Sequence, residues 1–178
     1  MNDLLKRYSE AAGTEVVDHL RQLAAPLAGL KVVHVNSTRE GGGVAEILVK
    51  MIPFMEALGL QTRWEIIEGN PEFYDCTKAF HNGLQGTAVG LSDTMLAAYE
   101  TVNRENCARL RPLLEEADFV FIHDPQPALF LGLCPNRKGK WVWRCHIDCS
   151  KPYRPVWKYL KNHVLGYDAS IFSLPDFA

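Results

Sequence analysis

The stretch LKVVHVNSTREGGGVAEIL, residues 30–48, joins two different patterns and decides the fold. Residues 30–35 are apolar and rich in valine, which is typical of a short buried strand. From Val44 onward, apolar residues recur at the spacing of one helix face. Three consecutive glycines separate the two patterns, although glycine is costly to order in a folded chain. The stretch therefore predicts a strand, a tight turn and a helix.

The rest of the chain alternates between strand and helix patterns. Further strands are expected at residues 62–67, 118–122, 141–145 and 169–174, and helices at 44–58, just after 70, 92–116 and 153–164. Such alternation implies parallel βαβ crossovers, and strands that are apolar on successive residues are covered on both faces. We therefore predict an α/β fold: one Rossmann-like domain over residues 1–178, with a doubly wound, mostly parallel sheet and helices on both faces. A helical extension is expected at about residues 1–29.

The composition excludes several classes of function. A formal net charge of -2 gives no electrostatic reason to expect a nucleic acid or an anionic membrane as partner. The longest apolar run, ALFLGLC, reaches about a third of the roughly 20 residues that span a bilayer, and the first ten residues lack the apolar core of a signal peptide. Five cysteines, an odd number without an export signal, favour reduced thiols. We expect a cytoplasmic protein.

One cluster resembles a metal site at first sight: Cys145, His146, Asp148 and Cys149. Its spacing is C-x3-C, and no second pair of ligands stands elsewhere in the chain. Because a structural zinc ion normally needs four protein ligands, we predict no metal here.

Three predicted strands end in dense polar sequence, NSTREGGG, HDPQP and HIDCS. Ligands of open α/β sheets bind beyond the carboxyl ends of the strands, so these segments predict one shared site. The glycines, Gly41, Gly42 and Gly43, precede a helix N-terminus, whose free amides favour anions such as phosphate. They match neither common phosphate motif, since G-x-x-x-x-G-K-[ST] is absent and Glu46 replaces the third glycine of G-x-G-x-x-G. A tight turn without a ligand remains the alternative.

The other two segments supply candidate polar side chains. His123 and Asp124 can bind sugar hydroxyls or exchange protons, or they can form a capping pair that shapes the turn. Strand alternation places Arg144 and His146 on one face, with Asp148 just beyond.

The segments STREGGGVAEIL, FHNGLQG, FVFIHDPQP and WRCHIDCSKPYRPVW together resemble the trehalose synthase group of retaining glycosyltransferases. This group belongs with the family-4 glycosyltransferases of GT-B fold and includes related trehalose phosphorylases. The resemblance runs from about residue 30 to the end of the chain, in order and with sensible spacing.

The resemblance implies the N-terminal half of a GT-B fold, in which two Rossmann-like domains face each other across a cleft. The implied reaction forms trehalose from NDP-glucose and glucose, with the anomeric configuration retained. By resemblance, the triple glycine lies against the donor diphosphate and His146 is the catalytic residue near the donor sugar. The acceptor-sugar pocket is then expected to contain His123, Asp124, Arg144 and Asp148.

The resemblance also sets the expected partners. Sugar and nucleotide-sugar substrates are expected, with NDP-glucose as donor substrate and no cofactor, no metal, no nucleic acid and no membrane. The C-terminal donor domain of the family is absent from this sequence, so the chain alone is expected to be inactive, and a homodimer is left open. The alternatives are a trehalose phosphorylase, a non-catalytic sugar-binding or interaction module, and, less favoured, a dinucleotide-dependent oxidoreductase.

Overall fold

A computed structural model describes residues 3–178 of the chain. Residues 1 and 2, which the predicted extension includes, lie outside the described part. Five strands form one sheet in the order β2-β1-β3-β4-β5, and every neighbouring pair is parallel. The strands are β1 (Lys31–Asn36), β2 (Gln61–Ile66), β3 (Phe119–His123), β4 (Lys140–Arg144) and β5 (Ala169–Ile171). The predicted doubly wound parallel sheet is confirmed.

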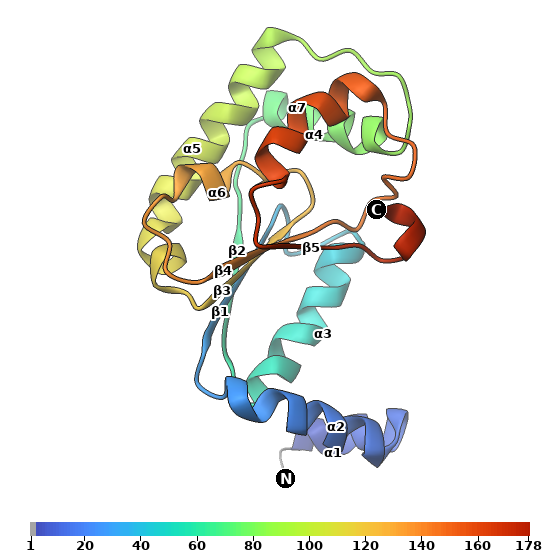
Figure 1. Ribbon diagram of the computed structural model, residues 1–178, viewed down its shortest axis with the longest axis vertical. Coiled ribbons are helices and arrows are strands. Elements are labelled where there is room, and N and C mark those ends of the chain that lie inside the picture. The colour runs from blue at the N-terminus through green and yellow to red at the C-terminus, as the bar shows by residue number, and fades with distance from the viewer. Residues whose placement is uncertain (1–2) are drawn as a thin grey trace.

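Helices cover both faces of this sheet (Figure 1). One face carries α4 (Pro71–Leu84), α5 (Asp93–Glu116), α6 (Phe130–Leu133) and α7 (Arg154–Val164), and the other carries α3 (Gly43–Ala57). The extension folds as a hairpin of α1 (Asp3–Ala12) and α2 (Thr14–Ala24) against α3. A short 3-10 helix, η1 (Ala25–Leu27), follows α2, and another, η2 (Pro175–Phe177), lies near the end of the chain.

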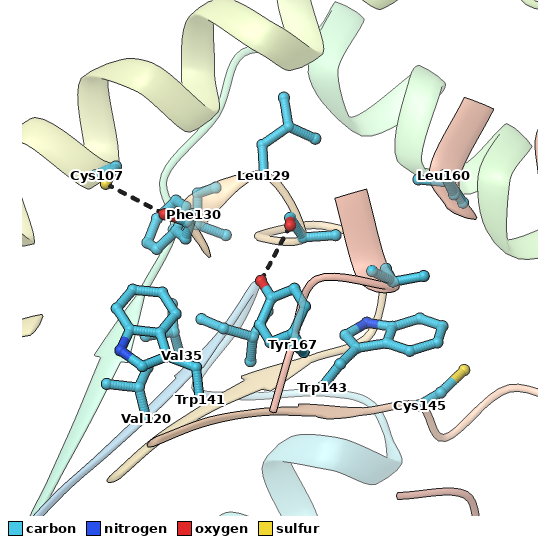
Figure 2. Packing of buried hydrophobic residues seen from close by; sticks show 14 of the residues in the cluster. Val35, Cys107, Val120, Leu129, Phe130, Trp141, Trp143, Cys145, Leu160 and Tyr167 are labelled. Carbon is cyan, nitrogen blue, oxygen red and sulfur yellow. Dashed lines mark hydrogen bonds between the residues drawn. The ribbon is translucent and has the colours of Figure 1, made fainter. Parts of the chain in front are cut away.

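The main core lies between the sheet and helices α4–α7. Trp141 and Trp143 of β4 point from the sheet into this layer, where Figure 2 shows them beside Tyr167. The hydroxyl of Tyr167 donates a hydrogen bond of 3.0 Å to the carbonyl of Ala128, so its polar tip is satisfied inside the core. Side chains on a strand alternate between faces, so the β1 residues between the core valines, including His34, point to the α3 face.

Local sequence signals explain most element boundaries. Ser92 caps α5, the helix predicted over residues 92–116, because its hydroxyl accepts a 3.2 Å hydrogen bond from the amide of Met95. Gly13, with a φ of 98°, separates α1 from α2. Pro53 lies inside α3 without ending it.

Two expectations about elements were wrong in detail. The last strand ends at Ile171 rather than at residue 174, and the chain then bends into η2. The apolar run ALFLGLC contains a short helix, α6, that the sequence pattern did not predict. A four-residue helix shows too little periodicity to be recognised, and this run is apolar because Phe130 is fully buried. Among residues 3–178, no helix combines the length and apolar character that a membrane crossing requires.

Candidate active site at the carboxyl edge of the sheet

The candidate site lies where the strand order reverses. The chain runs outward from β1 to β2 and then returns to β3 on the other side of β1. Ligands of open α/β sheets bind at such a point. A cavity of about 260 Å³ opens there, near the lower end of the range of about 300–1,000 Å³ for small-molecule sites. It is lined by residues 36–38, residues 41–45, His81, His123, Asp124 and Gln126.

The glycine turn forms one wall of this cavity. Gly41 and Gly42 have φ values of 71° and 100°, which L side chains rarely adopt, so the turn itself requires glycine at both positions. Gly43 starts α3 without a positive φ, and a Cβ built on it meets no atom within 4 Å. The fold therefore gives no reason for glycine at this third position. The first amides of α3 line the cavity with no partner inside the helix.

Asp124 forms the opposite wall and joins two strand ends. Its φ of 61° is uncommon for a residue other than glycine, although aspartate tolerates this conformation better than most. Three hydrogen bonds hold it there. Its amide donates to the carbonyl of Arg144 at 2.9 Å, its carbonyl accepts from the indole of Trp143 at 3.0 Å, and its Oδ1 accepts from the amide of His146 at 2.7 Å. Asp124 thus shapes the turn while also lining the cavity.

Three histidines from three strand ends form a row beside Asp124. His34 Nδ1 lies 3.0 Å from His123 Nε2, and His123 Nδ1 lies 3.0 Å from His146 Nε2. His34 also stacks on Phe121 with ring centroids 4.8 Å apart. His34 and His123 are buried, and His146 is partly exposed. We name these three residues the histidine row.

The surroundings keep the histidine row neutral. Burial lowers the pKa of His34 to about 4. Burial, followed by the neighbouring His34, His146 and Arg144, lowers the pKa of His123 to about 2. Burial and then Arg144 lower the pKa of His146 to about 4. At neutral pH all three rings therefore act as one donor and one acceptor each.

Asp124 responds to burial in the opposite direction. Burial raises its pKa to about 6, although the hydrogen bond from the amide of His146 and the charge of Arg144 both lower it. A carboxyl with such a pKa changes charge just below neutral pH, within the range that proton-transfer groups use.

Three of the sequence-predicted residues, His146, Arg144 and Asp148, do not line the cavity, although His146 contacts His123, which does. The guanidinium of Arg144 turns toward β5 and donates to the carbonyls of Cys145 and Ile171 at 2.8 and 3.2 Å and to Ser173 Oγ at 3.1 Å. Asp148 closes its own turn, because its Oδ1 accepts a 2.9 Å hydrogen bond from the amide of Ser150, which lowers its pKa. The glycine turn, His123 and Asp124 line one cavity, and His146 contacts His123 beside it. The side chain of Arg144 acts on His123, Asp124 and His146 only through its charge, while its backbone carbonyl accepts from the amide of Asp124.

Sequence reasoning missed other residues of the site. His34 lies in a buried strand, where no local pattern distinguishes it from the valines around it. His81 and Gln126 line the cavity from the end of α4 and the loop after β3. Both stand in segments already noted, FHNGLQG and HDPQP, so polar residues in those segments were the available signal.

A second cavity of about 410 Å³ adjoins the first, and Ser37 and Thr38 line both. Its other walls carry two arginines and two glutamates: Arg39, Arg109, Glu65 and Glu68. Both arginines are engaged, since Arg39 donates to the carbonyl of Trp64 at 2.6 Å and Arg109 to that of Ile66 at 2.7 Å.

The cysteines beside His146 are buried and reduced. The Sγ atoms of Cys145 and Cys149 lie 3.5 Å apart, and both contact the carbonyl of Ile147. Across residues 3–178, no three His, Cys, Asp or Glu side chains are placed to share a metal ion.

Comparison with known proteins identifies the family of this chain. Residues 34–178 match the family described as "Trehalose synthase, N-terminal domain". The chain is 44% identical over 174 residues to a trehalose synthase of Pyrococcus horikoshii and 40% identical over 175 residues to one of Rubrobacter xylanophilus; both matches cover 97% of this chain. A trehalose phosphorylase of Pleurotus pulmonarius is 30% identical over 182 residues, covering 91% of this chain and 25% of that protein.

The extent of these matches shows which part of the relatives the chain represents. It spans 41% of the Pyrococcus synthase and 42% of the Rubrobacter synthase. The matched family covers the glycine turn, the histidine row and the whole sheet apart from the start of β1. The chain therefore belongs to the family of trehalose synthase N-terminal domains.

Proposed function

We propose that this chain is the acceptor-side domain of a retaining glycosyltransferase that forms trehalose from NDP-glucose and glucose. The observation that carries the proposal is the cavity at the strand-order reversal, where the glycine turn faces His123 and Asp124. The higher identity to synthases than to phosphorylases supports synthesis over phosphorolysis. The share of the relatives left unmatched supports a second, C-terminal domain that holds the donor.

The chemistry of glycosyl transfer suits this arrangement. Negative charge develops on the departing diphosphate, and amides fixed at the N-terminus of α3 can stabilise that charge without rearranging. Neither the φ of Gly43 nor the atoms around it exclude a side chain, so the fold alone does not explain the glycine. A diphosphate that approaches the backbone closely would explain it. A ligand would use the space that the missing Cβ leaves open.

The acceptor glucose needs several oriented hydrogen bonds, and the opposite wall offers them. His123 and Asp124 line the cavity, and the partly exposed His146 continues this polar group by contacting His123. We assign His146 to the reacting donor sugar and His123 and Asp124 to the acceptor. Arg144 contributes through its charge, and Asp148 shapes the loop that carries His146. We expect the transfer to proceed without a metal ion, since the polar groups assigned here are amides, histidines and a carboxyl.

The test uses the chain joined to its C-terminal donor domain, incubated with NDP-glucose and glucose. Trehalose is the expected product, and proton NMR of the newly formed linkage identifies its anomeric configuration. His146→Ala should abolish most turnover with little loss of stability, whereas His19→Ala, which removes an exposed histidine of α2, should leave turnover unchanged. A disaccharide other than trehalose, or equal loss in both variants, contradicts the proposal.

The phosphorylase relatives supply a second candidate reaction on the same scaffold. Trehalose is therefore also incubated with inorganic phosphate and, separately, with a nucleoside diphosphate. Cleavage that depends on phosphate indicates a phosphorylase, and cleavage that depends on the diphosphate indicates the reverse reaction of a synthase.

A further inference from the structure

The histidine row raises a question that the proposed function leaves open: which ring nitrogens carry hydrogen. Both contacts in the row join two imidazole nitrogens at 3.0 Å. Each contact needs one N–H and one bare nitrogen. If the rings are neutral, only two arrangements satisfy both contacts, and they run in opposite directions along the row.

In the outward arrangement every ring carries its hydrogen on Nδ1. His34 then donates to His123, His123 donates to His146, and His146 holds an Nδ1–H at the open end. In the inward arrangement every ring carries its hydrogen on Nε2, and His146 presents a bare Nδ1. Within residues 3–178, Nδ1 of His146 has no hydrogen-bond partner, and His146 is partly exposed, so a ligand or solvent molecule that reaches this atom meets whichever form is present.

The closed end of the row distinguishes the two arrangements. His34 is 1% exposed, it stacks on Phe121, and its Nε2 is buried with no hydrogen-bond partner among the described residues. The outward arrangement leaves a bare nitrogen there, whereas the inward one buries an N–H that lacks an acceptor. Buried N–H groups without an acceptor are rarer in proteins than buried acceptors without a donor, so the inward arrangement is the less favourable one. At the open end, water satisfies either form, so the difference at His34 decides.

We propose that the histidine row is fixed in the outward direction, with His34 as a positioning residue that makes His146 present an Nδ1–H donor. Each hydrogen bond then strengthens the next, because a ring that accepts at one nitrogen donates better at the other. His146 thereby meets its ligand as a neutral donor to oxygen. In this state its Nδ1 has no lone pair with which to remove a proton from a sugar hydroxyl.

The direction of the row does not depend on the proposed function; only the identity of the oxygen acceptor, a sugar or diphosphate oxygen, rests on it. Under that function, His146 holds and orients the donor substrate rather than acting as a general base. The same geometry would present the same donor in a phosphorylase or in a sugar-binding module.

Long-range proton–nitrogen correlation NMR on the 15N-histidine-labelled chain at about pH 7.5 tests the proposal. Bare and hydrogen-bearing ring nitrogens give well-separated 15N resonances, so the tautomer of each ring is read directly. The expected spectrum shows hydrogen on Nδ1 of His34, His123 and His146. Hydrogen on Nε2 of His146 would overturn the proposal without any variant.

Two substitutions test the part played by His34. His34→Ala opens a space in which water can donate to or accept from His123, and His34→Asn places there an amide that can do either. Either folded variant should shift the two nitrogens of His146 toward averaged positions, because nothing then fixes the direction. His19→Ala is the matched control and should leave the spectrum of His146 unchanged. If His146 keeps its Nδ1–H in a folded His34 variant, His34 does not set the tautomer of His146.

The two proposals can fail separately. If His146 carries Nδ1–H but the two-domain protein makes no trehalose, the proposed function is rejected and the proposed direction of the histidine row stands. If the two-domain protein makes trehalose but His146 carries Nε2–H, the proposed direction of the histidine row is rejected and the proposed function stands.

Discussion

Lowering the pH from about 7.5 to about 5 should destabilise this fold by about 3 kcal/mol, because two buried histidines stay neutral while the unfolded chain takes up their protons. Burial lowers the pKa of His34 to about 4 and that of His123 to about 2, against 6.5 for an unperturbed imidazole. Below pH 6.5 the unfolded chain therefore binds protons that the folded chain does not bind, and the free energy of unfolding falls.

The magnitude follows from these pKa values. Between about pH 7.5 and about pH 5, His34 and His123 each remove about 2 kcal/mol of stability. Asp124 has the opposite sign, since its raised pKa of about 6 makes the folded chain take up a proton before the unfolded chain does, which offsets about 1 kcal/mol of that loss. The pKa values of His146 and His163 are also lowered, so these residues too lose stability at lower pH. Because both are only partly buried, solvent screening makes their contributions small beside those of His34 and His123. Asp168, with a pKa lowered to about 2, titrates below this window.

Urea unfolding at the two pH values, followed by the fluorescence of the buried Trp141 and Trp143, measures the effect. His34→Phe keeps the stack on Phe121 without a titrating ring and should reduce the pH difference by about 2 kcal/mol. Equal unfolding midpoints at the two pH values in the unmodified chain, or the same pH difference in His34→Phe, would refute the reasoning.

Three further outcomes are expected. Gly42→Ala should cost about 1–2 kcal/mol in urea unfolding because its φ is 100°, whereas Gly43→Ala should leave stability within about 0.5 kcal/mol yet weaken nucleoside diphosphate binding in calorimetry; equal losses of stability would contradict the assigned turn geometry. Asp124→Asn keeps an acceptor for the amide of His146 and a residue that tolerates positive φ, whereas Asp124→Ala keeps neither. Asp124→Ala should therefore be less stable than Asp124→Asn by about 1–2 kcal/mol. Equal urea midpoints for the two variants would count against the role of that hydrogen bond. EDTA should leave trehalose formation by the two-domain protein unchanged, and loss of activity that Mg²⁺ restores would show that the transfer needs a metal.

Much of the fold was open to prediction because the signals were local. The glycine turn between β1 and α3, the cap at Ser92 and the break at Gly13 each follow from one or two residues whose backbone or hydroxyl settles the geometry. The alternation of strands and helices then restricted the sheet to parallel crossovers. Helix α6 escaped prediction because four residues show too little of a period.

The site was predicted only in part. The polar strand ends predicted that the glycine turn, His123 and His146 would meet, since parallel strands end at one edge. They did not predict that the side chain of Arg144 turns to β5, because that depends on carbonyl groups supplied by a strand distant in the sequence. They also missed His34, which looks like any other residue of an apolar strand.

The sequence by itself therefore determined most of the elements, the family and the segments that border the site. Only the tertiary structure decided that β1 lies beside β3 and β3 beside β4, which aligns His34 with Phe121 and His123 with Arg144. That register places His123 within hydrogen-bonding distance of both His34 and His146, which are distant from it along the chain. The physical reason is that a side chain's face follows from local alternation, whereas its neighbours follow from strand order and register, which depend on the packing of the whole sheet.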